Sequence, residues 1–352
     1  MGVNSELFTL PAPSPLEAGD LEEALSAPSA AVVDTVRRHP GPYMVLGAGG
    51  KMGLHLCLML RRALVLAGRE PVVHAVSRFS SLRERDEFEG RGLTPHVCDL
   101  CDPAALAALP DAGVIFFLAG VKFGTSTAPE LLNRINGEMP RQVAERFRGV
   151  RTVAFSTGCV YPFVEHTSGG ATEDTPVSPN GAYAASCVLR EQAFIDASVR
   201  HGTPAAIIRL NYSVELRYGL LLDIATRVLR GEPVDVTTGH VNVIWQRDAI
   251  DHIVRSLDIA ASPAAILNVT GAETLAVRDL AQRFGRRLGT NVTITGTEAE
   301  TAWLNNASRS HQLFGVPPVS TDQMIDWIAQ WLQRGGSTWA KPTGFERRDG
   351  NF

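Results

Sequence analysis

The sequence predicts an α/β protein built on a doubly wound parallel Rossmann sheet, with a smaller C-terminal lobe. Short apolar runs rich in β-branched and aromatic residues alternate with segments that are long enough for crossover helices. A glycine-rich turn follows the first of these runs. Such alternation is typical of a parallel sheet that is covered by helices on both faces.

Residues 1–40 predict an N-terminal leader, because they are rich in Pro, Ala and Ser and hold one helical pattern over 29–41. Residues 41–210 predict the Rossmann domain. Its first crossover helix is expected over 54–68, an apolar stretch that is interrupted by charge and too short to span a bilayer. Six strands are expected over 43–46, 71–76, 94–97, 114–119, 151–156 and 205–210.

From residue 211 the alternation loosens, and 211–335 predict mainly a smaller, substrate-binding lobe. Residues 336–352 predict a polar tail with aromatic anchors, for which the cleft and a neighbouring subunit are the two candidate contacts. Amphipathic helices are expected over 219–231, 248–260, 275–289 and 321–336, and short strands over 241–245, 266–270 and 292–296.

The chain carries a formal net charge of −4 and has no basic tract, which argues against nucleic acid and anionic membranes as partners and favours a small molecule. Its first residues lack a basic region followed by an apolar core, and Glu6 stands where a myristoylation signal has Ser or Thr. We therefore expect a cytoplasmic protein. Five cysteines cannot all pair, and "CDLC" lacks the further ligands of a metal site, so reduced thiols and no metal are expected.

A glycine-rich loop, "VLGAGGKMG", lies where the first strand turns into a helix. Missing side chains let the backbone approach a pyrophosphate, whose charge the helix N-terminus then stabilises. The spacing predicts dinucleotide binding, and the alternative is a purely structural tight turn. The residues expected at the cofactor are Gly47, Gly49, Gly50, Lys51, Met52 and Gly53.

The end of the second strand predicts which dinucleotide binds. An acid there accepts a hydrogen bond from the ribose 2′-hydroxyl of NAD, whereas an arginine pairs with the 2′-phosphate of NADP. Ser77 and Arg78 stand here without an acid, so NADP is predicted, with NAD as the alternative if Arg78 is only a solvated loop charge. After the third strand, Asp99 and Leu100 are expected at the adenine, although Asp99 could instead cap the following helix.

Several motifs occur together in the order of a known family: "GAGGKMG", "DL" at 99–100, "LAGVKFG", "NRINGE", "FSTGCVYP", "YAASC", "RLNY" and "LNVTGAETLAVRDLAQ". On these motifs the chain resembles the extended short-chain dehydrogenase/reductase family, in its NAD-dependent epimerase/dehydratase group, over about residues 43–335. That group acts largely on nucleotide sugars. The resemblance implies that "LAGVKFG" places Ala119, Gly120 and Lys122 at the cofactor.

The resemblance also implies a proton relay. In the family a tyrosine exchanges the proton of the reacting hydroxyl or carbonyl while hydride moves to or from the nicotinamide, and a Ser or Thr polarises the same oxygen. By motif these residues are Tyr183, which also contacts the cofactor, and Thr157, unless Thr157 is only a satisfied strand-end hydroxyl. Asn211 in "RLNY" lies where the family often contacts substrate.

Cys187 departs from the family pattern. The family's lysine, four residues after the tyrosine, lowers the pKa of the phenol and holds the nicotinamide ribose, and a neutral thiol does neither. We expect Arg190, on the same helix face, or Lys122 to supply the missing charge. The alternatives are a slow enzyme, a tyrosine that only donates a hydrogen bond, and a chemical role for the Cys187 thiol itself.

The stretch after the fifth strand narrows the reaction. Family dehydratases carry Thr-Asp-Glu where this chain reads "TGC" from Thr157, so dehydration is disfavoured. Cys159 matches an acid/base cysteine of the fucose-forming epimerase/reductases, and a buried, inert thiol is the alternative. Those enzymes pair the cysteine with a histidine where this chain has Leu216, whose neighbours Glu215 and Arg217 become candidate substrate contacts.

The sequence therefore predicts an NADP- or NAD-dependent epimerase or reductase that acts on a hydroxyl or keto carbon of a sugar or nucleotide-sugar-like substrate. The alternative is a non-catalytic dinucleotide-binding protein, a redox sensor or scaffold that has lost the lysine. Retention of Thr157 and Tyr183 favours an enzyme. A homodimer is expected.

Overall fold

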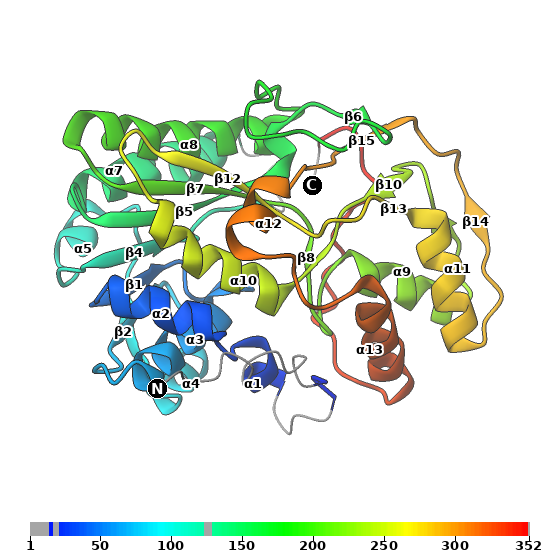
Figure 1. The fold of residues 1–352 in the computed structure, drawn as a ribbon, viewed down its shortest axis with the longest axis horizontal. Helices are drawn as coiled ribbons and strands as arrows, with labels where there is room; N and C mark the ends of the chain where they lie inside the picture. Colours follow the sequence, from blue (N-terminus) through cyan, green and yellow to red (C-terminus); the bar gives the residue numbers. More distant parts are fainter. Residues whose placement is uncertain (1–13, 17–20, 123–128, 351–352) are drawn as a thin grey trace, which may run out of the picture.

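A computed structural model describes residues 14–16, 21–122 and 129–350, so the start of the leader and the last two residues of "LAGVKFG" lie outside the described residues. Its centre is one seven-stranded sheet in the order β12-β7-β5-β4-β1-β2-β3, and every neighbouring pair of strands is parallel (Figure 1). The predicted fold class is confirmed. The strands are β1 Tyr43–Leu46, β2 Val73–Ser77, β3 Thr94–Val97, β4 Val114–Phe117, β5 Arg151–Thr157, β7 Ala205–Leu210 and β12 Ala265–Val269.

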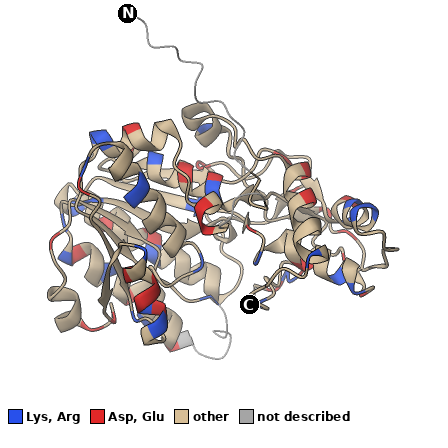
Figure 2. Ribbon diagram, turned by 90° about the horizontal axis from the view of Figure 1, so that it is seen from below, with Lys and Arg blue, Asp and Glu red and all other residues tan. Residues whose placement is uncertain are grey.

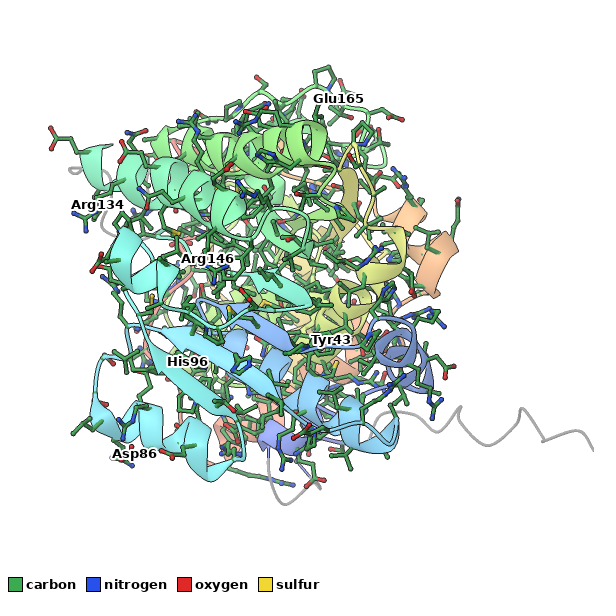
Figure 3. All side chains as sticks on the ribbon, turned by 90° about the vertical axis from the view of Figure 1, so that its left-hand side faces the viewer. Tyr43, Asp86, His96, Arg134, Arg146 and Glu165 are labelled. Atoms are coloured by element: carbon green, nitrogen blue, oxygen red, sulfur yellow. The ribbon has the colours of Figure 1, made fainter. Side chains whose placement is uncertain are left out.

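Helices cover both faces of this sheet, and each layer has its own apolar core. Figure 3 looks along the layers from the side of edge strand β3, which His96 marks, and shows Asp86 on α4 and Arg146 on α7. On the first face lie α2 Ala30–Arg38, α3 Gly53–Leu66, α4 Leu82–Gly90 and α10 Gln246–Arg255. On the second lie α5 Pro103–Ala107, α7 Met139–Arg146 and α8 Ala182–His201. A continuous lead-in, α6 Pro129–Leu132 and a π-helical turn Asn133–Glu138, precedes α7.

Strand β1 lies inside the sheet because its sequence is apolar on both sides. All four residues are fully buried, and Tyr43 is opposite Val73 of β2 on one side and Val114 of β4 on the other. The chain reverses its direction of strand addition between β1 and β4. In doubly wound sheets this reversal opens a crevice at the carboxyl ends of the strands, where ligands bind.

The smaller lobe has a separate apolar core, in which Trp245 meets Trp327 edge-on at 5.3 Å between ring centroids. The predicted segment 211–335 is divided between two parts: β12, α10 and α12 join the Rossmann sheet and its helix layer, and most of the rest builds the lobe. Its helices are α9 Leu220–Leu229, α11 Val277–Leu288 and α13 Thr321–Gln333. Helix α12 Ser308–Phe314 packs beside β12, and α1 Leu21–Leu25 adds Leu25 to the lobe core.

Short two-residue strands pair with one another outside the central sheet. The single strand expected over 241–245 is wrong, because its two ends pair with different partners: β10 with β13 and β11 with β8. The short strands are β6 Val164–Glu165, β8 Ser213–Val214, β9 Val234–Asp235, β10 His240–Val241, β11 Ile244–Trp245, β13 Leu275–Ala276, β14 Ile294–Thr295 and β15 Thr301–Ala302.

The C-terminal tail runs from the lobe back to the Rossmann domain. Phe345 is buried in the lobe core, and both the backbone N–H and the hydroxyl of Thr343 donate to Asp223 of α9, at 2.7 and 2.6 Å. Farther along, the carbonyl of Arg348 accepts from Asn180, directly before α8. The tail therefore ties the lobe to the N-terminus of the helix that carries Tyr183.

Lys, Arg, Asp and Glu are scattered along the described ribbon, and β1, β4 and α5 carry none of them (Figure 2). No helix within the described ranges has the length and apolarity that a bilayer crossing needs. The five cysteines are free, and the described part of the chain holds no group of three or more His, Cys, Asp or Glu side chains arranged around a metal position.

A buried ion pair joins α8 to strand β7 behind the crevice. Arg209 donates twice to Glu191, at 2.9 and 2.7 Å, and the two side chains are 5% and 4% exposed. Ser156 of β5 adds a hydrogen bond to Glu191, and Arg209 also donates to the Tyr161 hydroxyl. Because every partner is satisfied, the pair fixes the rotation of α8 on the sheet.

We predict that Glu191→Gln destabilises the fold by about 3 kcal/mol or more, because it leaves a buried guanidinium without its charge partner. The matched control is Asp34→Asn, which breaks the exposed pair between Asp34 and Arg37 and changes stability by less than about 1 kcal/mol. Urea unfolding of both variants measures the difference. Equal effects of the two substitutions would contradict the structural importance of the buried pair.

Candidate active site

The glycine-rich loop packs so closely that side chains are excluded at its ends. Gly47 has φ +92°, and a Cβ on it would lie 2.6 Å from the backbone N of Ala119. A Cβ on Gly53 would lie 2.1 Å from the Ala48 carbonyl oxygen. The loop is also tied to β2, since the N–H groups of Gly47 and Ala48 both donate to the Val76 carbonyl. These contacts fix the loop at the carboxyl edge of the sheet.

A cavity of about 410 Å³ opens beside this loop and brings most of the predicted cofactor residues together. Asp99 does not cap α5, because Asp102 does so by accepting from Ala104, while Asp99 accepts from Cys101 and faces the cavity. The predicted residues in the lining are Gly47, Gly49, Gly50, Ser77, Arg78, Asp99, Leu100, Ala119 and Gly120.

Two opposite charges lie near the part of the loop at Gly49. Arg78 lines the cavity, and it has no hydrogen-bond or ion-pair partner among the described residues. Glu84 was not predicted: it belongs to α4, and its Oε1 would lie 2.8 Å from a Cβ on Gly49. Its Oε2 accepts from the backbone N–H and the hydroxyl of Ser80, at 2.8 and 2.7 Å. The sequence does not predict Glu84 at the loop, because Glu84 follows the second strand by seven residues and is brought to the loop by helix α4.

A second cavity, of about 210 Å³, continues from the loop and holds the predicted proton-relay residues. It is lined by the side chains at the ends of β5 and β7, the start of α8, the lobe and the tail. Sequence reasoning missed Tyr218 and Thr343, which enter from the lobe and the tail. Its lining includes Lys51, Met52, Lys122, Thr157, Cys159, Tyr183, Asn211, Tyr218 and Thr343.

Tyr183 stands in the first turn of α8, directly after Gly181, where the tail backbone leaves no room for a side chain. A Cβ on Gly181 would lie 2.6 Å from the carbonyl oxygen of Gly350. Burial is the main cause that raises the pKa of Tyr183 well above its usual value, and a hydrogen bond with Cys187 adds to the rise, whereas the charge of Arg190 opposes it. The phenol is therefore protonated at neutral pH.

Two cations approach Tyr183, as the sequence predicts. The Lys122 Nζ lies 5.7 Å from the centroid of the Tyr183 ring, and its pKa is lowered by burial and raised by Cys159 and Cys187. Arg190 lies deeper: it donates to Asn136 at 2.6 Å, fills the space left by the missing side chain of Gly120, and does not line the cavity. Of the two, Lys122 is the cation in the cavity itself.

Thr157 ends β5 and faces the same cavity as Tyr183. Its oxygen accepts from the backbone N–H of Cys159 at 3.2 Å, which is the strand-end role that the sequence allowed. That bond uses a lone pair and leaves the hydroxyl proton available, and no acceptor for this proton lies among the described residues. Thr157 can therefore donate a hydrogen bond to a ligand oxygen in the cavity.

The two cysteines differ in position. Cys159 lines the cavity and is 8% exposed. Cys187 is fully buried one turn after Tyr183, among Val160, Tyr161 and Ala171, and burial raises the pKa of its thiol. Its thiol shares a hydrogen bond with the Tyr183 side chain, and the charge of Lys122 is close enough to be felt by both thiols.

Glu215 and Arg217 do not reach the cavity that holds Tyr183. Glu215 is fully buried and pairs with Arg217, which also pairs with Glu22 of α1, so both side chains are engaged within the protein. Arg217 instead lines a different cavity, on the α4 side of the glycine loop. Asn211 does line the site, although its amide already donates to Trp303 and Asn305.

The sheet, its glycine loop and the adjoining Thr157–Tyr183 cavity define a Rossmann-type α/β protein with a ligand crevice at its switch point. A model of the NAD dependent epimerase/dehydratase family matches residues 43–263, and the chain belongs to this family. A search among curated proteins found no match.

Solved structures share the fold at low sequence identity. The chain is similar to UDP-glucose 4-epimerase of Thermus thermophilus, solved with NAD: identity is 19%, the TM-score is 0.68, and the match covers 83% of this chain and 98% of the epimerase. UDP-glucuronic acid 4-epimerase of Bacillus cereus, also solved with NAD, is 18% identical with a TM-score of 0.69, and the match covers 83% of this chain and 98% of that epimerase. A UDP-galactose 4-epimerase is 23% identical with a TM-score of 0.66, and the match covers 83% of this chain and 99% of that epimerase.

Proposed function

We propose that this protein is a nicotinamide-dinucleotide-dependent epimerase or reductase that acts on a hydroxyl or keto carbon of a sugar or nucleotide-sugar-like substrate. The observation that carries the proposal is that Thr157, Tyr183 and Lys122 line one cavity next to the glycine loop. The UDP-sugar epimerases that share the fold support the substrate class. The homodimer and the cytoplasmic location stay predictions.

The residues fit a dinucleotide. The loop backbone and the start of α3 suit a pyrophosphate, because no side chain caps that helix N-terminus. The cavity lined by Arg78, Asp99 and Leu100 then takes the adenosine, and we propose NADP because Arg78 has no partner among the described residues that competes with a 2′-phosphate. Glu84 is the residue that favours NAD instead, since its carboxylate lies beside the same loop.

Each polar residue of the cavity has one task at the reacting carbon. The nicotinamide, when bound, supplies or takes up the hydride. Tyr183 gives a proton to the substrate oxygen when a carbonyl is reduced, and takes it back when the hydroxyl is oxidised. Thr157 donates a hydrogen bond to the same oxygen, and the Lys122 ammonium stabilises the phenolate that the donation leaves.

Lys122 takes the place of the family lysine in this mechanism. A lysine from the β4 loop brings its Nζ to 5.7 Å from the centroid of the Tyr183 ring, whereas the α8 position four residues after Tyr183 holds a buried cysteine. The charge of the buried Arg190 also lowers the pKa of Tyr183. The non-catalytic alternative gains no observation of its own, since the hydroxyl pair and a cation are all retained in one cavity.

For the hydroxyl pair, we predict that Thr157→Val and Tyr183→Phe each lower kcat by about 10²- to 10⁴-fold, because each removes a group that acts on the reacting oxygen. Cofactor affinity stays nearly unchanged, and calorimetry checks this. The combined loss of the double variant is smaller than the product of the single losses. Wild-type turnover by Tyr183→Phe would contradict the proposed relay.

For the relocated cation, Lys122→Met is predicted to lower kcat of the oxidising direction by about tenfold or more, because each unit of phenol pKa is worth about 1.4 kcal/mol. The rate should also rise at higher pH than in the wild type, since the phenolate forms later. The control Cys187→Ala removes a neutral thiol and should stay within about threefold of the wild type.

The same hypothesis predicts rescue. In Lys122→Ala, adding Cys187→Lys returns a cation to the phenol from the helix and should restore turnover by about tenfold over Lys122→Ala alone. Steady-state rates with cofactor occupancy measured in parallel decide the matter. Loss of all activity in Cys187→Ala, with fold and cofactor intact, would instead assign the chemistry to the thiol.

For the cofactor, NADPH is predicted to bind at least about tenfold more tightly than NADH, because a charge-assisted bond from Arg78 is worth about 1.5–3 kcal/mol. Arg78→Ala should erase the preference, and Arg83→Ala, an exposed arginine on α4, should not. Tighter NADH binding that Glu84→Gln abolishes would overturn the NADP assignment and make Glu84 the acceptor of the ribose hydroxyl.

A further inference from the structure

Two histidines at the edge of the central sheet turn their ring nitrogens toward each other. His74 of β2 and His96 of β3 lie on the same face of the sheet, because His96 is opposite Val76, two residues after His74. The Nδ1 of His74 is 2.9 Å from the Nε2 of His96, and the ring planes are inclined by 55°. Figure 3 shows His96 on β3, the last strand of the sheet on this side. Two lone-pair positions therefore meet at one place.

Both imidazoles can be reached from solvent and are neutral at pH 7. Each histidine is half-buried. Burial lowers the pKa of both, and the charge of His96 adds to the lowering at His74. Among the described residues no Lys, Arg, Asp or Glu contributes to either shift. A metal ion binding here would meet neutral ligands and would not have to displace a bound proton from an imidazolium.

A hydrogen bond between the two rings is the simpler use of this contact. One ring then donates and the other accepts, and the outer nitrogens, Nε2 of His74 and Nδ1 of His96, have no hydrogen-bond partner among the residues that the structure describes. A divalent ion can take the place of the shared proton. The donating ring moves its proton to its outer nitrogen, both inner nitrogens then present lone pairs, and no net proton is released.

The distance between the two nitrogens indicates the kind of ion. With metal–nitrogen bonds of about 2.0–2.1 Å, two ligands at 90° lie about 2.9 Å apart, whereas two tetrahedral ligands lie about 3.3 Å apart. The observed 2.9 Å fits the 90° arrangement. Nitrogen ligands at this angle are typical of Cu²⁺ and Ni²⁺, and the tetrahedral arrangement is typical of Zn²⁺.

We propose that His74 and His96 form a two-histidine site for a divalent transition-metal ion, Cu²⁺ or Ni²⁺, with the two nitrogens as neighbouring ligands. Water completes the coordination, since no third His, Cys, Asp or Glu in the described part of the chain joins the pair. The bound ion clamps edge strand β3 to β2. The site shares no residue with the 410 Å³ cavity beside the glycine loop, so it goes beyond the proposed function and does not depend on it.

The first test is calorimetry on the full-length, tag-free protein with Ni²⁺, which does not oxidise the free cysteines. We expect one tight site in a non-coordinating buffer, weaker binding of Zn²⁺, and no binding of Mg²⁺, which prefers oxygen ligands. Loss of an outer-sphere partner alone weakens metal binding about 10- to 100-fold, so His74→Gln and His96→Gln should each weaken Ni²⁺ binding at least about tenfold.

The matched control is His240→Gln. His240 belongs to another histidine pair, in which its ring stacks on that of His166 at 4.2 Å between centroids and 9° between planes. The lone pairs of two parallel rings lie in separate planes and do not meet at one atom. His240→Gln should therefore leave Ni²⁺ affinity unchanged. Circular dichroism without metal checks that all three variants keep the fold.

The second test uses the wild-type protein and does not depend on the folding of a variant. With ¹⁵N-labelled histidine, the chain gives ring signals from nine histidines. Paramagnetic Ni²⁺ at less than one equivalent should broaden two of these signals together. Broadening of a single histidine, Ni²⁺ affinity that neither His74→Gln nor His96→Gln changes, or tighter binding of Zn²⁺ than of Ni²⁺ would each overturn the proposed site.

Discussion

The arrangement of this site depends on one electrostatic constraint: a phenol buried in a protein can release its proton only beside a positive charge. Burial raises the pKa of Tyr183, and Cys187 stands at the helix position where the family resemblance predicts a lysine. Lys122, whose Nζ lies 5.7 Å from the Tyr183 ring centroid, and Arg190, held beneath the cavity by Asn136, are the two cations that the sequence predicts at the phenol, and Lys51 lines the same cavity. Because a charge in a low-dielectric site acts over several ångströms, the cation need not come from the same helix.

The surrounding fold holds these groups in place. The Glu191–Arg209 pair fixes α8 on the sheet, and Asn136 holds Arg190. At the other end of the site, the tail joins Asp223 of the lobe to the start of α8. The lobe, the tail and the strand ends of the sheet thus all contribute side chains to the lining of one small cavity.

Much of the fold follows from local sequence pattern. The six predicted strands of the sheet are confirmed, with ends shifted by one or two residues at β2, β4 and β5, because buried parallel strands are short, apolar and β-branched. The place of β12 at the edge of this sheet cannot be predicted from local sequence pattern. A short apolar strand fits the lobe as well as a sheet edge, and only its pairing with β7, which is distant in the sequence, decides between them. The pairing of β10 and β11 with separate strands is equally non-local.

The residues of the site also fall into a group that the sequence predicts and a group that it does not. The glycine loop, Thr157 and Tyr183 could be predicted because each lies at a strand end or a helix start. Glu84, Tyr218 and Thr343 are not, since a helix, the lobe and the tail bring them from far along the chain. Glu215 and Arg217 lie near the predicted stretch but pair with each other and with α1, away from the Tyr183 cavity.

The most direct test of the relocated cation is a crystal structure of the protein with its nicotinamide cofactor bound. We expect Lys122 to be the cation nearest to the Tyr183 hydroxyl, with Cys187 beside it and Arg190 still held by Asn136. A structure in which Lys122 points away from the phenol, or in which Arg190 replaces it in the cavity, would contradict the central claim that the missing helix lysine has been supplied from the β4 loop.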